Sequence, residues 1–147
     1  MTDSKGIATF NTVYPGWYTG RTTHMHIKVH IGSSLTNVGG AVYARGGHVS
    51  HTGQLFFDDT LTDTVAKVAP YSTGVSRRVR NTDDGIYRGA NGGTMTIAVK
   101  SLGSDIKQGM TGEITVGVDP TATPSPTGFG GPPNGGRPPR PSPPPKF

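Results

Sequence analysis

The sequence contains no cysteine, and this absence excludes disulfides, zinc fingers, thiolate nucleophiles and iron–sulfur clusters together. Long hydrophobic runs are also lacking, since none approaches the ~18 residues that a membrane-spanning helix needs. The opening residues MTDSKG have neither the basic nor the apolar region of a signal peptide. We therefore predict no membrane partner, and the chain as written carries no export signal.

Proline is scarce until late in the chain, because only two of the thirteen prolines precede residue 120. The stretch from there to the end has two phenylalanines as its only large apolar side chains. It cannot bury enough surface to offset the entropy of ordering it. We predict a single domain over residues 1–119 and a disordered Pro/Gly-rich tail over residues 120–147 with polyproline II character.

A large excess of positive charge is missing from the predicted domain. The chain has a formal charge of +5, from fourteen basic and nine acidic residues, and the tail holds Arg137, Arg140 and Lys146. The domain is left with eleven basic residues against nine acidic ones, a net charge of +2. No fingerprint of a nucleic-acid-binding module is present either, so we predict no nucleic-acid partner.

Glycine, by contrast, is abundant: the 23 glycines are roughly twice the usual share. Together with many threonines and valines, they favour short strands joined by tight turns. One helix is predicted over residues 61–68, capped by Asp58 or Asp59 and ended by Pro70. We read residues 32–50 as a long loop with a short strand at 41–44, and residues 72–93 as a surface excursion. Strands are predicted over residues 6–13, 23–31, 54–57, 94–100 and 112–118.

The strand over residues 23–31 has the clearest alternation. Its apolar side chains point one way and its polar side chains the other: Met25, Ile27, Val29 and Ile31 against His24, His26, Lys28 and His30. His24 and His26 lie two apart, so their Cα atoms are within ~7 Å and both imidazoles reach a common point. This spacing alone is weak evidence for a metal site, because a polar strand face also carries histidines by chance.

The residues before this strand strengthen the metal hypothesis. In Tyr14–Arg21 a Pro-Gly turn can fold Tyr18 back over the histidine face and place Arg21 beside it. The run FNTVYPGWYTGRTTHMHIKVH resembles the metal-binding stretch of the intradiol ring-cleavage dioxygenases, the catechol and protocatechuate dioxygenase family. That stretch has Pro-Gly-x-Tyr followed by Arg-x-x-His-x-His. The likeness continues through HTGQLFFDDTLTD, which contains Gln54, and through RNTDDGIY, and covers most of residues 2–118.

The resemblance implies an all-β fold, a β-sandwich with one short helix, which holds Fe(III) between the sheet and its loops. Two tyrosinates and two histidines bind this iron, and Tyr18, His24 and His26 match three of the four ligands. Phenolate oxygens stabilise the ferric state, while neutral imidazoles leave the ion Lewis-acidic. The implied reaction opens a catechol-type ring between its two hydroxylated carbons with O2. In it Tyr18 acts as an internal base, Arg21 stabilises negative charge on the substrate, and Gln54 shapes the pocket.

The second tyrosine ligand of the family has no match in this sequence. It lies well upstream of the Pro-Gly-x-Tyr turn, and here only seventeen residues precede Tyr18. The resemblance therefore predicts the C-terminal portion of a catalytic domain, with exposed strand edges and an uncertain activity, so a catalytically impaired remnant is an alternative. Secretion is implied only by analogy with the similar single-domain subgroup, and neither the diol nor the oligomeric state is predicted. Substitute phenolates would have to come from Tyr14, Tyr43, Tyr71 or Tyr87.

Two readings from other classes remain open. His24, His26 and His30 form a possible three-histidine site for a divalent metal. The Pro-x-x-Pro spacing in PPRPSPPPK suits an aromatic-lined groove, so the chain can also be read as a binding module that acts through its tail. The arginines of residues 77–80 are read as a solvated loop, and Asp83-Asp84-Gly85 as a turn.

Overall fold

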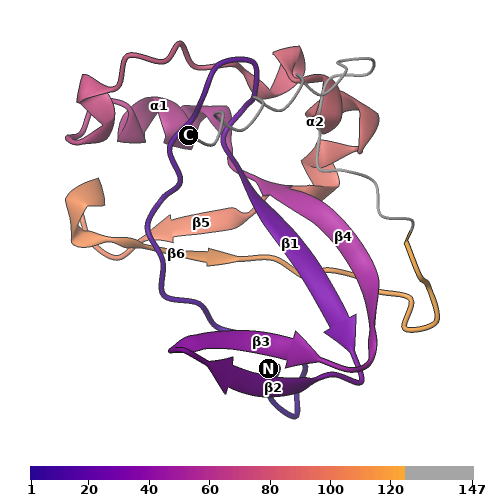
Figure 1. Ribbon diagram of the computed structural model, residues 1–147. Helices are drawn as coiled ribbons and strands as arrows, with labels where there is room; N and C mark the ends of the chain where they lie inside the picture. The colour runs from indigo at the N-terminus through magenta and orange to yellow at the C-terminus, as the bar shows by residue number, and fades with distance from the viewer. Residues whose placement is uncertain (125–147) are drawn as a thin grey trace, which may run out of the picture.

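The computed structural model describes residues 1–124 as three two-stranded antiparallel sheets with short helices gathered at one end (Figure 1). The predicted β-rich class is thereby confirmed, whereas nearly all of the predicted tail, residues 120–147, lies outside the described residues. The strands are β1 (His24–Ile31), β2 (Ser34–Val38), β3 (Ala41–Arg45), β4 (His48–Phe56), β5 (Ala98–Ser101) and β6 (Met110–Glu113). The α-helices are α1 (Asp59–Val65) and α2 (Gly85–Gly89). Single 3-10 turns lie at Tyr71–Thr73, Asn81–Asp83, Gly92–Met95 and Ile106–Gln108.

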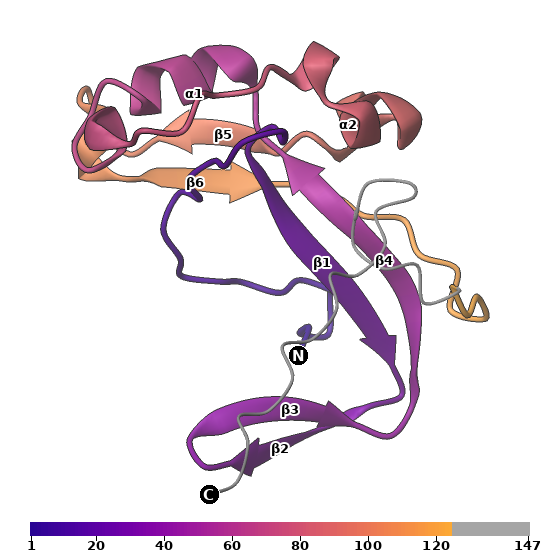
Figure 2. The ribbon, with the colours of Figure 1, turned by 45° about the horizontal axis from the view of Figure 1, so that its top comes forward.

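The pair of β1 and β4 forms the long axis of the molecule. It runs from the helices at one end to the β2–β3 hairpin at the other, as both ribbon views show (Figures 1 and 2). The register places His24 opposite Phe56 and His26 opposite Gln54, and it shifts between Val29 and His30. The predicted alternation of β1 is confirmed, because from His26 onward its polar side chains are exposed and its apolar ones half-buried.

The short strand predicted at residues 41–44 is confirmed as β3, and its pairing with β2 corrects the rest of the long loop predicted over residues 32–50. Gly39 and Gly40 have φ values of 60° and 84° and connect Val38 to Ala41, which lie opposite each other. Two successive positive φ angles are what a two-residue hairpin turn requires, and glycine adopts them without strain. Gly46 and Gly47, with φ of 70° and 61°, connect β3 to β4, which pairs with β1 and belongs to another sheet.

The predicted strand over residues 6–13 is wrong. The segment has no ladder partner among residues 1–124, and a strand exists only through such pairing. Ile7, Phe10 and Val13 are 57%, 81% and 77% exposed. In both ribbon views the N-terminus lies by the β2–β3 hairpin, and the chain then climbs toward α1 before it enters β1 (Figures 1 and 2).

Helix α1 forms where the sequence predicts it and ends three residues earlier than predicted. The Asp58 side chain accepts hydrogen bonds from the amides of Thr60 and Leu61 at 2.7 and 3.3 Å, which satisfies donors that a helix N-terminus leaves free. Strands β5 and β6 are shorter than predicted. Helix α2 was not predicted, and it begins with the same device, a capping Asp84.

The segment of residues 72–93 is more than the predicted surface excursion. Asn81 and Asp84 within it are only 7% and 1% exposed. Its arginines are not simply solvated, because four ion pairs join Arg78 and Arg80 to Asp59 and Asp63. Arg78 Nη1 lies 2.6 Å from Asp59 Oδ1 and Arg80 Nη1 2.7 Å from Asp63 Oδ2, while Arg78 also pairs with Asp63 and Arg80 with Asp59 at 4.0 Å. These pairs tie the segment to α1, so Arg78 and Arg80 are already matched to acidic partners.

The interior is small and unusually polar. Among residues 1–124 the buried hydrophobic side chains are Phe56, Phe57 and Val65. The buried polar residues are more numerous: Thr22, Thr23, Ser50, Gln54, Thr62, Asn81 and Asp84. Hydrogen bonding at the junction of β1, β4 and the segment of residues 72–93 therefore stabilises this fold alongside apolar packing. No helix in the described part of the chain has the length and apolarity to cross a membrane.

Tyr14 gives the fold a testable dependence on pH. Its hydroxyl lies 2.7 Å from Thr62 Oγ1, its ring packs 4.6 Å from that of Phe57, and burial raises its pKa from 10.0 to about 12. The unfolded chain loses this proton near pH 10 while the folded chain keeps it. The contribution of Tyr14 is therefore complete below pH 10 and is lost between pH 10 and 12, on the order of 2 kcal/mol.

Urea unfolding between pH 8 and 12 measures this loss. Tyr14→Phe is expected to flatten the alkaline decline, because no phenol is left to titrate. Thr62→Val removes the same hydrogen bond but keeps the phenol, so its decline should persist. An alkaline decline of equal depth in Tyr14→Phe and the parent chain contradicts the assignment to Tyr14.

Candidate metal centre

Tyr18 lies over the start of β1, as the sequence predicts. The turn between Tyr18 and Arg21 is closed by a hydrogen bond of 3.3 Å from the Arg21 amide to the Tyr18 carbonyl. Gly20 has a φ of 89°, a conformation that glycine adopts readily. The turn brings Tyr18 Oη to 3.4 Å from His24 Nε2.

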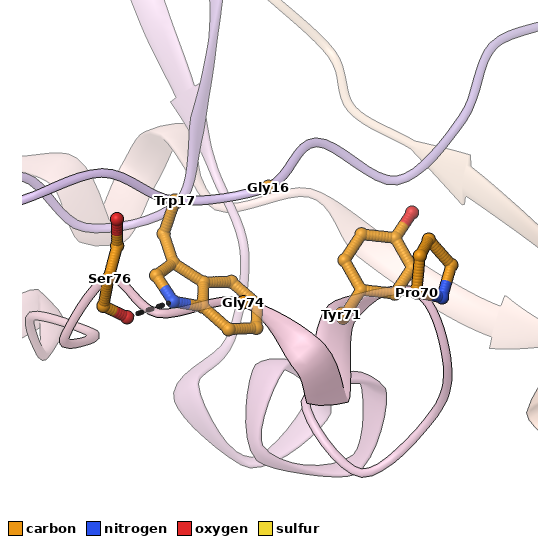
Figure 3. A pocket seen from close by; sticks show the side chains of 6 residues that line it. All are labelled: Gly16, Trp17, Pro70, Tyr71, Gly74 and Ser76. Atoms are coloured by element: carbon orange, nitrogen blue, oxygen red, sulfur yellow. Dashed lines mark hydrogen bonds between the residues drawn. The ribbon is translucent and has the colours of Figure 1, made fainter.

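The turn is anchored by Trp17, which lines a hollow together with Tyr71 (Figure 3). The rings of Trp17 and Tyr71 are stacked, with centroids 6.2 Å apart and planes at 25°. Trp17 Nε1 donates a hydrogen bond of 2.9 Å to the Ser76 carbonyl. The hollow of about 210 Å³ is completed by Gly16, Pro70 and Gly74. Trp17 therefore fixes the chain immediately before Tyr18.

The two predicted histidine ligands are neighbours on one strand face. The ring centroids of His24 and His26 are 5.1 Å apart, and those of Tyr18 and His24 are 5.7 Å apart. Tyr18 is 53% exposed, so the group opens to solvent. The structure thus brings together one phenol and two imidazoles from a stretch of nine residues, and their role as ligands stays a prediction.

The His24 ring is oriented by the backbone two residues before it. Its Nδ1 lies 2.7 Å from the Thr22 carbonyl, which can only accept, so Nδ1 carries the proton and Nε2 presents its lone pair toward Tyr18. Burial lowers the pKa of His24. Burial, with the nearby charges of His24 and Arg21, lowers the pKa of His26 as well. Both rings are therefore neutral near pH 7, the form that binds metal ions.

This donor set fits a ferric ion. A phenol oxygen that ionises on binding and two neutral imidazole nitrogens are the O and N ligands that such an ion accepts. The three-histidine alternative is not supported, because residues 1–124 contain no group of three or more His, Cys, Asp or Glu side chains placed to hold a metal. His30 lies beyond the register shift of β1.

The other tyrosines do not supply a clear second phenolate. Tyr14 contacts Thr62 through its hydroxyl, and the Tyr71 hydroxyl donates to the Tyr14 carbonyl at 2.6 Å. The Tyr87 ring packs edge-on against Phe56, with centroids 5.0 Å apart. Tyr43 lies in the exposed β2–β3 hairpin.

Arg21 and Gln54, the predicted catalytic residues, lie together beside the histidines. Gln54 is 8% exposed and sits opposite His26 in the β1–β4 register. Arg21 Nη2 donates a hydrogen bond to Gln54 Oε1, and Arg21 Nε donates one of 2.8 Å to Asp84 Oδ2. The guanidinium is thereby held at two points at the edge of the site.

Asp84 is the residue beside this site that sequence reasoning missed. Its side chain is fully buried, and its two oxygens accept from Arg21 Nε and from the amides of Thr22, Ile86 and Tyr87 at 2.8 to 3.0 Å. Burial alone raises the pKa of Asp84, but the hydrogen bonds from Thr22, Tyr87 and Arg21 outweigh it, and the pKa lies below its usual value. A buried carboxylate therefore stays ionised next to Arg21.

Comparison with solved structures identifies known proteins of similar fold. An intradiol ring-cleavage dioxygenase from Tetranychus urticae and a second crystal structure, also of a dioxygenase, each match with a TM-score of 0.67, 28% identity and 84% of this chain covered. The matches cover 53% and 52% of those chains, so this chain spans about half their length. No family model and no curated protein matches the sequence. The predicted structural resemblance is confirmed.

Proposed function

Because this chain shares the fold of intradiol ring-cleavage dioxygenases, we propose that it is a dioxygenase acting on catechol-type diols. In this proposal Tyr18, His24 and His26 bind its Fe(III). The observation that carries the proposal is the distance of 3.4 Å between Tyr18 Oη and His24 Nε2, with the His26 ring next to them. Arg21 and Gln54 lie beside this group on a fixed network. These residue types and their placement are the ones that the predicted chemistry needs.

Ferric iron in this position would supply the Lewis acidity that draws a catechol, as its anion, into the site. Tyr18 contributes an anionic oxygen and a place to receive a substrate proton. In the overall reaction both atoms of O2 enter the product. The bond between the two hydroxylated carbons breaks, and catechol becomes a muconate-type dicarboxylic acid.

Arg21 adds a fixed positive charge to this site. Its guanidinium bonds Asp84 and Gln54, so it needs no rearrangement when negative charge develops on a neighbouring ring. A charge fixed in advance stabilises a transition state more than one that must first be ordered. Gln54 accepts a hydrogen bond from Nη2 of this guanidinium. From its place opposite His26, it closes the side of the site.

Addition of ferric iron to the full chain tests the proposal. A tyrosinate-bound ferric ion absorbs visible light by charge transfer, so the iron-loaded protein is expected to be coloured. Tyr18→Phe removes the phenolate and should abolish this band. Tyr43→Phe, an exposed tyrosine in β3, is the matched control and should keep it.

Oxygen uptake completes the experiment. We expect the iron-loaded chain to consume O2 with catechol and Tyr18→Phe to consume far less. Iron that binds without colour, or a band of equal strength in Tyr18→Phe, contradicts the assignment of Tyr18. A coloured protein that consumes no O2 with any catechol contradicts the proposed activity of this chain.

A further inference from the structure

We propose that Asp84 is a positioning residue that orients both Arg21 and His24, the first through an ion pair and the second through the peptide of Thr22. The inference rests on the proposed function of the site, because it assigns a role toward the iron ligand His24 and the cation Arg21. Unlike these two residues, Asp84 has a side chain that is fully buried.

The direct link runs from Asp84 to Arg21. Asp84 Oδ2 accepts from Arg21 Nε at 2.8 Å, and the Arg21 side chain is only 13% exposed. Because the guanidinium is planar, fixing Nε also fixes the direction of the two terminal nitrogens. Nη2 is thereby directed at Gln54 Oε1, where it donates a hydrogen bond.

The indirect link passes through Thr22, which is 2% exposed. The same Asp84 Oδ2 accepts from the Thr22 amide at 2.8 Å, and Thr22 Oγ1 donates to Asn81 Oδ1 at 2.6 Å. The Thr22 carbonyl then accepts from His24 Nδ1 at 2.7 Å. The position of Thr22 therefore sets both the tautomer and the direction of the His24 ring. Such partners of a metal-binding histidine tune its affinity for the metal.

Further hydrogen bonds hold Asn81 and Asp84 themselves in place. Asn81 Nδ2 donates to the Phe57 carbonyl at 2.9 Å, which ties this segment to the end of β4. Asp84 Oδ1 accepts from the amides of Ile86 and Tyr87 at 2.8 and 3.0 Å, as the cap of α2.

The two side-chain oxygens of Asp84 accept hydrogen bonds from different groups, and this separates a positioning role from simple helix capping. One side-chain oxygen is enough to cap a helix. In Asp84 that oxygen is Oδ1, while Oδ2 accepts from Arg21 Nε and the Thr22 amide. A residue needed for the helix alone would not have to direct its second oxygen there.

Asp84→Asn tests the positioning role in the full chain. The amide oxygen can keep the cap of α2, but the NH2 group that replaces Oδ2 cannot accept from Arg21 or Thr22. In the metal-free protein, nitrogen NMR of the imidazoles is expected to show His24 change from one tautomer to a mixture. Ferric iron affinity, from titration of the same samples, is expected to fall ~10- to 100-fold.

Asp63→Asn is the matched control. It makes the same substitution in a carboxylate that pairs with Arg78 and Arg80, away from the histidines in the hydrogen-bond network. It is expected to leave the His24 tautomer and the iron affinity as in the parent chain. Should Asp84→Asn not fold, Thr22→Val removes the bond to Asn81 while keeping the shape of the side chain, and a partial tautomer change is expected.

Three results overturn the inference: an unchanged His24 tautomer in folded Asp84→Asn, an equal change in Asp63→Asn, or, where Thr22→Val is used, an unchanged tautomer in that variant. The NMR measurement needs no iron. A parent chain that binds no ferric iron, yet shows the tautomer change in Asp84→Asn, therefore overturns the proposed function and leaves the positioning role supported.

Discussion

Replacing Phe56 by alanine is expected to lower the free energy of unfolding by about 3–5 kcal/mol, the usual range for a buried phenylalanine. Phe56 is 1% exposed and is one of three buried hydrophobic side chains in residues 1–124. Its ring packs against those of Tyr87 and His24, with centroids 5.0 and 6.4 Å apart. Because the interior is otherwise polar, few apolar neighbours can move in to fill the cavity.

Such a loss is a large part of the ~5–15 kcal/mol that stabilises an ordinary domain, so Phe56→Ala should show a low or absent urea midpoint. Phe10→Ala is the matched control, since that side chain is 81% exposed and its truncation should leave the midpoint unchanged. Phe56→Leu, which keeps much of the volume, should cost less than Phe56→Ala. Equal midpoints for the two alanine variants contradict the burial of Phe56.

The parts of the fold that depend on neighbouring residues could be predicted from the sequence. The alternation of β1 and the capping of α1 by Asp58 involve residues within a few positions of each other. The same holds for the contact of Tyr18 with His24, six residues apart, because a glycine-containing turn directly precedes a strand. The pairing of Arg21 with Gln54 needs the register of β1 and β4, and was reached only through the family resemblance.

The failures arise where the partner decides the structure. Residues 6–13 alternate like a strand, but alternation cannot show whether a ladder partner exists, and none lies among residues 1–124. The β2–β3 hairpin had a local signal that was missed, the Gly39-Gly40 pair between two short strands. Glycine-rich polar sequence was taken for loop, although the same glycines allow the turns.

Asp84 could not be assigned from the sequence for a different reason. Its local pattern, an aspartate before a glycine, predicts a turn, whereas Asp84 caps α2 and Gly85 begins it, and the pattern gives no sign of burial. The bonds that define its role reach Arg21 and Thr22, 63 and 62 positions away. A buried polar residue is recognised only when its partners are known, because it is stable only with them.

Arg21→Met is expected to destabilise the chain by about 3–5 kcal/mol, because it leaves the Asp84 carboxylate buried without its cation. The two side chains are 13% and 0% exposed, so water can replace little of the lost interaction. An exposed ion pair would cost only ~0–1 kcal/mol, and the two cases are well separated by urea unfolding at pH 7. Arg45→Met, at the exposed end of β3, is the control and should leave the stability nearly unchanged.

The double variant Arg21→Met with Asp84→Asn gives the stricter test. Removing the charge of Asp84 also removes the cost of burying it alone, so the double variant should be more stable than Arg21→Met by itself. The asparagine still offers one oxygen to the amides at the start of α2, which preserves the cap. Additive losses in the two single variants would mean that no coupling exists between the two side chains. Coupling in the expected direction would show that the cation beside the histidines is held by a carboxylate from the distant segment of residues 72–93.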